Sequence, residues 1–128
     1  MISEKIEFKT PECQLSLLLP PGGMPRLNCR GRISMPAPAA DLNPFFDAVH
    51  EQLVAEGATQ IHIDFSELEF MNSSGFKCFV HWVEKVNQLR KEMRYRLVFE
   101  GRDQRVWQRS GLPALRVFAP QLVEYTLA

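Results

Sequence analysis

At 128 residues, the chain is long enough to fold as one domain, residues 1–128, with a substantial buried core. Its composition, with 45% hydrophobic and 23% charged residues, is typical of a soluble globular protein. Basic and acidic residues number 15 each, so the formal net charge is zero, which excludes a general attraction to nucleic acid or anionic membranes.

The cysteines and the N-terminal residues indicate the compartment. Cys13, Cys29 and Cys78 are odd in number, widely spaced and without a C-x-x-C pair, which argues against a disulfide framework or a zinc site. Residues 1–5 do not resemble a signal peptide, and no apolar run approaches the roughly 18 residues that a membrane span requires. We therefore expect a cytoplasmic protein without a bound metal or cofactor.

The first third of the chain predicts an N-terminal hairpin. Residues 2–9 alternate weakly and are compatible with an edge strand, and residues 13–19 are apolar enough for a buried strand. Residues 20–25, with the sequence PPGGMP, must form a turn. Residues 26–33 alternate with a period of two, which predicts a strand with one buried face. The three arginines of this strand fall on the other face, where we expect solvated side chains rather than a partner-binding patch.

An amphipathic helix is predicted next. It is expected to begin near Asp41 or Asn43, with Pro44 at the first helical position, and to end at Gly57 as a left-handed cap. One stripe carries the apolar residues Leu42, Phe45, Phe46, Val49 and Leu53. His50 lies beside a glutamate and is expected on the surface.

A second strand is predicted over residues 59–65. It follows a helix, so a crossover and a parallel strand pair are expected. Its clean alternation indicates that one face of the sheet is less deeply covered than in a doubly wound fold. His62 and Asp64 share the polar face and could form a catalytic pair, but no third group at a suitable spacing supports that function.

The stretch FMNSSG, residues 70–75, joins this strand to a long amphipathic helix predicted from Ser74 to about Met93. Asn72 and Ser73 are both good N-cap residues, because their side-chain oxygens can accept from free N–H groups of the first turn. Hydroxyl groups at the positive end of a helix suit an anion, including a phosphate attached to one of them. A plain helix cap explains the same residues. Lys77, one turn beyond Ser73, could reach such a phosphate.

Two residues of this helix leave their role open. Cys78 and Trp82 are four residues apart, at the edge of a broad apolar stripe. They could pack in the core or form a docking surface for a partner.

The C-terminal part predicts a strand over residues 95–100 and a short helix over residues 104–110 that Gly111 closes. A last strand is expected over residues 115–118. Residues 121–128 are expected to form a terminal helix or to pack loosely.

Residues 61–75, 97–101 and 105–112 together resemble STAS domains, the family of anti-sigma factor antagonists. Residues 61–75, IHIDFSELEFMNSSG, resemble the strand and phosphorylation loop of that family. Residues 97–101 and 105–112 resemble its next strand, short helix and Gly-Leu corner. The resemblance implies an α/β, STAS-like single domain. Its mixed sheet would have about five strands and an N-terminal hairpin, with three to four helices packed mainly on one face. The hairpin turn is longer than the family pattern leads us to expect.

The resemblance also implies a function, that of a bacterial partner-switching regulator in signal transduction rather than an enzyme. Ser73 corresponds to the family's phosphorylation site, and the partner-binding residues would be Asn72, Ser73, Ser74, Gly75 and Lys77. The implied partners are a serine kinase that is also an anti-sigma-type protein and a PPM-type phosphatase. The chain departs from the family at Asn72, where many members have Asp, which removes a negative charge beside the phosphate acceptor.

Three other functions are weighed against this one. A STAS-like scaffold subunit of a signalling or lipid-transport complex would keep the fold without phosphorylation. A serine hydrolase using Ser73 with His81 or His62 is disfavoured, because the G-x-S-x-G elbow is absent and His81 lies about 12 Å along the helix from Ser73. A nucleotide-binding role has neither a P-loop nor a G-x-G-x-x-G motif to support it.

Overall fold

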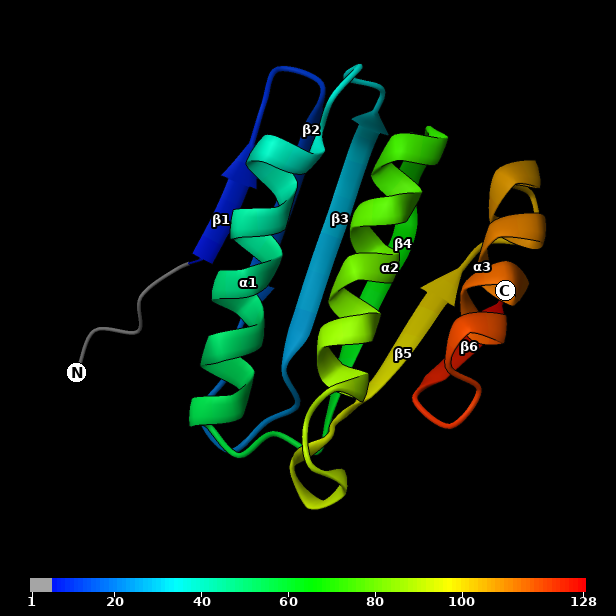
Figure 1. The fold of residues 1–128 in the computed structure, drawn as a ribbon. Coiled ribbons are helices and arrows are strands. Elements are labelled where there is room, and N and C mark those ends of the chain that lie inside the picture. The colour runs from blue at the N-terminus through cyan, green and yellow to red at the C-terminus, as the bar shows by residue number, and fades with distance from the viewer. Residues whose placement is uncertain (1–5) are drawn as a thin grey trace.

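The computed structural model describes residues 6–128, which form a mixed six-stranded sheet with three α-helices and a short 3₁₀ helix (Figure 1). The strands are β1 (Ile6–Lys9), β2 (Cys13–Leu18), β3 (Arg26–Ile33), β4 (Gln60–Met71), β5 (Arg96–Gly101) and β6 (Val123–Leu127). The helices are α1 (Ala39–Ala55), α2 (Ser73–Asn87), the 3₁₀ helix η1 (Lys91–Met93) and α3 (Val106–Phe118).

The strands follow one another across the sheet in chain order. The pairs β1–β2 and β2–β3 are antiparallel, and the three pairs from β3 to β6 are parallel, with a helix in each connection. Figure 1 shows α1 and α2 side by side over the same face of the sheet, and α3 packs against α2, β5 and β6. The predicted hairpin, crossover and mixed sheet are therefore confirmed, with six strands rather than about five.

The sheet has one covered and one open face, as the alternation predicted. In β4, Ile61, Ile63 and Phe65 are fully buried beneath the helices, whereas His62 and Asp64 on the other face are partly exposed. Cys78 and Trp82 are 2% and 0% exposed, so both belong to the core and the docking-surface alternative is wrong. Gly57 has a φ of +64°, the left-handed conformation expected of a helix cap.

Some element boundaries differ from those predicted. Residues 2–5 of the predicted edge strand lie outside the described residues. The first helix begins at Ala39, so Pro44 lies inside it rather than at its first position. The second helix ends at Asn87, not near Met93, and the Arg94 guanidinium donates to the backbone oxygens of Asn87 and Leu89 just beyond it.

The strand over residues 95–100 and the helix from about residue 104 correspond to β5 and the first part of α3, but the elements predicted beyond residue 110 were wrong. Residues 115–118, predicted as a strand, form the last turn of α3. Residues 121–128, predicted to form a terminal helix or to pack loosely, contain strand β6. Gly111 lies inside α3 and does not close the helix, and its φ is not that of a left-handed cap. Leu112 and Leu115 are both buried at helical spacing, and this packing keeps the chain helical through Pro113.

His50 is not on the surface as predicted, because it lies on the buried side of α1 with only 7% exposure. Its Nδ1 lies 2.7 Å from the Tyr95 hydroxyl, which also accepts a hydrogen bond of 2.8 Å from Trp82 Nε1. An indole N–H can only donate, so the tyrosine proton is left for Nδ1 of His50. These bonds join α1, α2 and the start of β5 within the core.

Because of this burial, the stability of the fold depends on the protonation of His50. Burial lowers the pKa of His50 and Lys85 lowers it further, while Asp47 and Glu51 oppose the shift. The folded state thus binds this proton less readily than the unfolded state, whose imidazole has a pKa near 6.5. The resulting stabilisation is complete above that value and decreases as the pH falls below it.

We therefore expect the free energy of unfolding, measured by urea titration, to fall as the pH is lowered from about 7.5 to about 5.5. At the higher pH, His50→Gln should have a lower free energy of unfolding than the wild type, because the contact with Tyr95 changes. Its free energy of unfolding should also decrease less as the pH is lowered. An unchanged pH dependence in His50→Gln would contradict this role of His50.

Candidate functional site

The FMNSSG loop lies where two parallel strands end together. Ile33, the last residue of β3, is paired with Met71, the last residue of β4. The backbone N–H of Asn72 donates to the oxygen of Ile33 at 2.9 Å, which continues the strand pairing by one bond beyond the sheet. Ligand sites of open α/β sheets commonly lie at this carboxyl edge.

Asn72 forms the N-cap of α2, as predicted, and Ser73 is the first residue of the helix. The Asn72 backbone is extended, with φ −75° and ψ 172°, and its Oδ1 accepts from the Gly75 N–H at 2.7 Å. Its Nδ2 donates to the backbone oxygen of Met35 at 2.9 Å. Asn72 therefore connects the start of α2 to the β3–α1 connection.

Gly75 is required by close packing at the base of the loop. A Cβ at this position would lie 2.7 Å from Ile33 Cγ2 and 3.0 Å from Met71 Cγ. The residue is buried, and it allows the first turn of α2 to rest directly on the ends of β3 and β4.

Ser73 and Lys77 are the exposed polar residues at the start of α2. Ser73 is exposed, and its hydroxyl forms no hydrogen bond with another residue of the described chain. Lys77 is also exposed and makes no ion pair within residues 6–128. Ser74 is half-buried, and its backbone oxygen accepts from Cys78 Sγ at 3.4 Å. Ser73 is thus the hydroxyl of the loop that a modifying enzyme could reach most directly.

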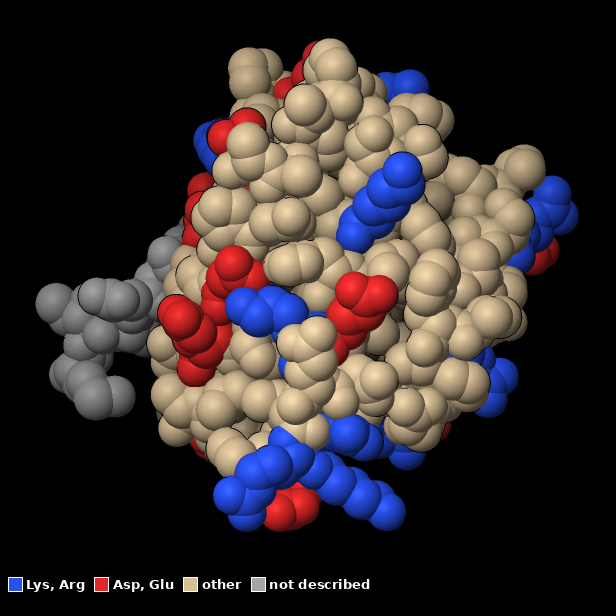
Figure 2. Space-filling model, in the orientation of Figure 1, with Lys and Arg blue, Asp and Glu red and all other residues tan. Residues whose placement is uncertain are grey.

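A shallow hollow of about 210 Å³ lies beside Ser74, between the first turns of α1 and α2. Ser74, Lys77 and Asn43 line it, and Asn43 Oδ1 is shielded from solvent without a hydrogen-bond partner among the described residues. Figure 2 shows that the surface over the first turns of these two helices carries few charged residues. A negative charge added at Ser73 or Ser74 would therefore have few charged side chains around it.

Met35 and Asn43 also belong to this region, although no sequence pattern indicated them. Met35 contributes only a backbone oxygen, which no side-chain pattern can reveal. The predicted parallel pairing was the available signal, because it places the β3–α1 and β4–α2 connections next to each other.

The two histidines considered for hydrolysis lie elsewhere. His62 Nδ1 is 2.7 Å from Glu100 Oε1 on the open face of the sheet, and His81 Nε2 is 3.4 Å from Asp47 Oδ1 between α2 and α1. Neither forms a hydrogen bond with Ser73. The arrangement therefore contains no nucleophile–base pair at Ser73.

His62 and Asp64 share a face but do not pair with each other. Asp64 instead accepts from the Ser66 N–H at 2.8 Å and lies 3.5 Å from Arg26 Nη2, which also lies 3.4 Å from Glu100. Burial alone would raise the pKa of Asp64, but the Ser66 hydrogen bond and Arg26 lower it overall. The cluster is an ion-pair network across β3, β4 and β5, and Arg26 takes part in it rather than being merely solvated.

Residues 6–128 offer no candidate site of two other kinds. No helix in this part of the chain combines the length and apolar character needed to cross a bilayer. It also contains no group of three or more His, Cys, Asp or Glu residues placed to hold a metal ion.

Comparison with known proteins identifies the fold. No family model matches the chain, and no curated protein matches it. Among solved structures, an anti-sigma factor antagonist from Mycobacterium paratuberculosis is similar, with a TM-score of 0.61 and 24% identity over 94% of this chain and 92% of that one. An uncharacterized DUF3478-family protein with a SpoIIAA-like fold from Shewanella loihica is similar, with a TM-score of 0.55 and 12% identity over 98% of this chain and 91% of the other. The chain therefore has the STAS-like fold that its sequence predicted.

Proposed function

We propose that this protein is a non-enzymatic, cytoplasmic partner-switching regulator that is controlled by reversible phosphorylation of Ser73. In this proposal, a serine kinase of the anti-sigma type binds the unmodified surface around Ser73 and also phosphorylates it. A PPM-type phosphatase restores the binding-competent form. The partner surface comprises the loop residues Asn72, Ser73, Ser74 and Gly75, together with Lys77.

The observation that carries this proposal is the exposed, unpartnered hydroxyl of Ser73 at the N-terminus of α2. Phosphorylation at this position does not require the fold to change, because the N-terminal end of a helix carries about half a positive charge. Lys77, one turn further along the helix and without an ion pair in the described chain, adds a full positive charge nearby. The similar fold of an anti-sigma factor antagonist supports the same function.

The same geometry explains how phosphate would release a partner. A phosphoserine carries about −1.5 to −2 charges near neutral pH. The surrounding surface is mostly uncharged, so a partner that fits it closely would have to bury those charges without compensation (Figure 2). A penalty of about 3 kcal/mol weakens binding more than a hundredfold.

Asn72 favours a second candidate function, that of a scaffold subunit that is not phosphorylated. Both ends of its amide are used within the fold, by Gly75 N–H and Met35 O. An aspartate could keep the first bond but has no N–H for the second. Asn72 therefore holds the loop in place. A scaffold subunit of a signalling or lipid-transport complex would need such a fixed loop even without phosphorylation.

The first test is phosphosite mapping by mass spectrometry on protein isolated from its own host. We expect one phosphate on Ser73, which Ser73→Ala removes and Ser74→Ala retains. In affinity capture, a protein kinase should bind the wild type and Ser73→Ala, and bind Ser73→Glu at least about tenfold more weakly, since even a partial phosphate mimic buries charge.

Absence of phosphate at Ser73 across growth and stress conditions would contradict the switch. If the same partners were then captured equally by the wild type and Ser73→Glu, the scaffold function would be the better description.

A second test addresses Asn72 itself. We expect Asn72→Asp to lower the free energy of unfolding by about 1 kcal/mol, because the bond to Met35 O is lost while the helix cap is kept. Asn72→Ala should cost about 2 kcal/mol, because it loses both bonds. Chemical denaturation near pH 7 measures both. Equal stability of Asn72→Asp and the wild type would show that the Met35 contact contributes nothing.

A further inference from the structure

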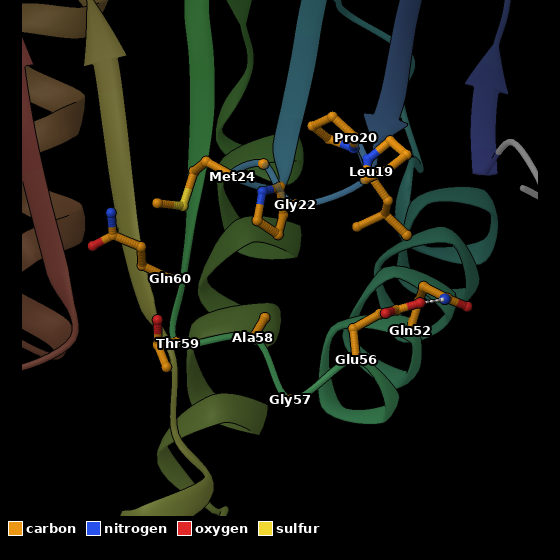
Figure 3. A pocket seen from close by; sticks show the side chains of 13 residues that line it. Leu19, Pro20, Gly22, Met24, Gln52, Glu56, Gly57, Ala58, Thr59 and Gln60 are labelled. Atoms are coloured by element: carbon orange, nitrogen blue, oxygen red, sulfur yellow. Dashed lines mark hydrogen bonds between the residues drawn. The ribbon is translucent and has the colours of Figure 1, made fainter.

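A larger hollow of about 820 Å³ lies at the opposite end of the sheet from Ser73. The long turn between β2 and β3 forms one side of it, and the end of α1 with the connection to β4 forms the other (Figure 3). Thirteen residues line it, among them Leu19, Pro20, Glu56 and Ala58. Its volume falls within the range of about 300–1,000 Å³ that is usual for small-molecule sites. The proposed switch at Ser73 does not use this region.

The lining offers few hydrogen-bond donors to a ligand. Three of its residues are prolines, which have no backbone N–H. The N–H of Gly23 donates to Pro20 O within the turn, and those of Gly57 and Ala58 donate back into the end of α1. The backbone of the lining therefore offers a ligand more acceptors than donors.

The charge of the lining favours cationic ligands. Glu56 lines the hollow, whereas no lysine or arginine does. In the described chain, the Glu56 carboxylate accepts only a neutral hydrogen bond, from Gln52 Nε2 at 3.0 Å, and makes no ion pair (Figure 3). Helix α1 also has no basic residue in its last turn, although the C-terminal end of a helix favours cations. The Glu56 carboxylate thus lies beside the backbone-capped C-terminal end of α1, and neither has a positively charged partner among the described residues.

Apolar surface accompanies this negative charge. Leu19 and Pro20 from the long turn and Ala58 from the opposite side line the hollow. Figure 3 shows Leu19 and Pro20 across the hollow from the Glu56–Ala58 segment. A suitable ligand would place a cationic group near Glu56 and an apolar body against the turn.

We propose that this hollow is a binding site for a small organic cation, an amine that carries an apolar body. The ammonium group donates to the Glu56 carboxylate, the partial negative charge at the end of α1 adds to the attraction, and the body packs against Leu19 and Pro20. The site discriminates against anions, because the carboxylate and the helix end repel them.

The test titrates the full chain with 4-phenylbutylamine and follows backbone amide shifts by NMR. Two matched probes have the same body, 4-phenylbutyrate with a negative charge and 4-phenylbutanol with none. We expect the amine to shift the amides of Gly22, Gly23, Gly57 and Thr59 with a Kd of about 1 mM, which suits a ligand of this size. The alcohol should bind several-fold more weakly, and the carboxylate should produce no shifts there.

The matched variants are Glu56→Gln, which removes the charge with little change of shape, and Glu51→Gln, which removes an exposed charge of the same helix outside the hollow. Glu56→Gln should weaken amine binding about fivefold, and Glu51→Gln should leave it within about twofold. Retained amide dispersion in both variants shows that they are folded.

Three outcomes would overturn the proposal. The first is no shift of these amides at about ten times the expected Kd of the amine. The second is equal binding of the amine and the carboxylate, which would leave only a nonselective apolar cleft. The third is equal weakening by Glu56→Gln and Glu51→Gln, which would indicate a general effect of net charge.

Discussion

The parallel pairing of β3 with β4 up to their last residues is the constraint on which the Ser73 region depends. Because Ile33 lies opposite Met71, the connections to α1 and α2 leave the sheet side by side. The backbone N–H of Asn72 donates to the oxygen of Ile33, and its Nδ2 donates to the oxygen of Met35. These two hydrogen bonds hold the connections together, and each contributes about 1 kcal/mol of stability. Gly75 lets α2 rest on the strand ends. Ser73 is thereby presented from a rigid base.

Much of this arrangement could be predicted because it follows from local rules. The period-two pattern of β3 and β4 reports which face is buried, and it correctly indicated a sheet with helices over one face. Asn72 could be identified as a helix cap because capping needs only neighbours within three residues. The parallel pairing followed from the intervening helix, and so did the position of the loop at the edge of the sheet.

The failures concern contacts between residues far apart in the chain. His50 looks polar in sequence, and only the Tyr95 hydroxyl, 45 residues away, makes its burial favourable. The end of α3 was predicted as a strand because Gly111 was expected to close the helix, yet the packing of Leu112 and Leu115 keeps the chain helical. The tie from Asn72 to the backbone of Met35 has no side-chain signature, so the reason for Asn at this position required the structure.

The topology also places helix ends of opposite partial charge at the two ends of the domain. Each helix that connects parallel strands runs back along the sheet, so the N-termini of α1 and α2 lie at the Ser73 end and the C-terminus of α1 at the other (Figure 1). Helix ends carry about half a charge, positive at the first end and negative at the second. Lys77 and Glu56 have the sign of the helix end beside them, whereas Asp41 in the first turn of α1 and Lys85 in the last turn of α2 have the opposite sign. The 17 residues of α1 separate the ends by about 25 Å, well beyond the Debye length of about 8 Å at physiological salt. Charge at one end is therefore screened from the other, and any coupling between them requires movement of α1 or the sheet.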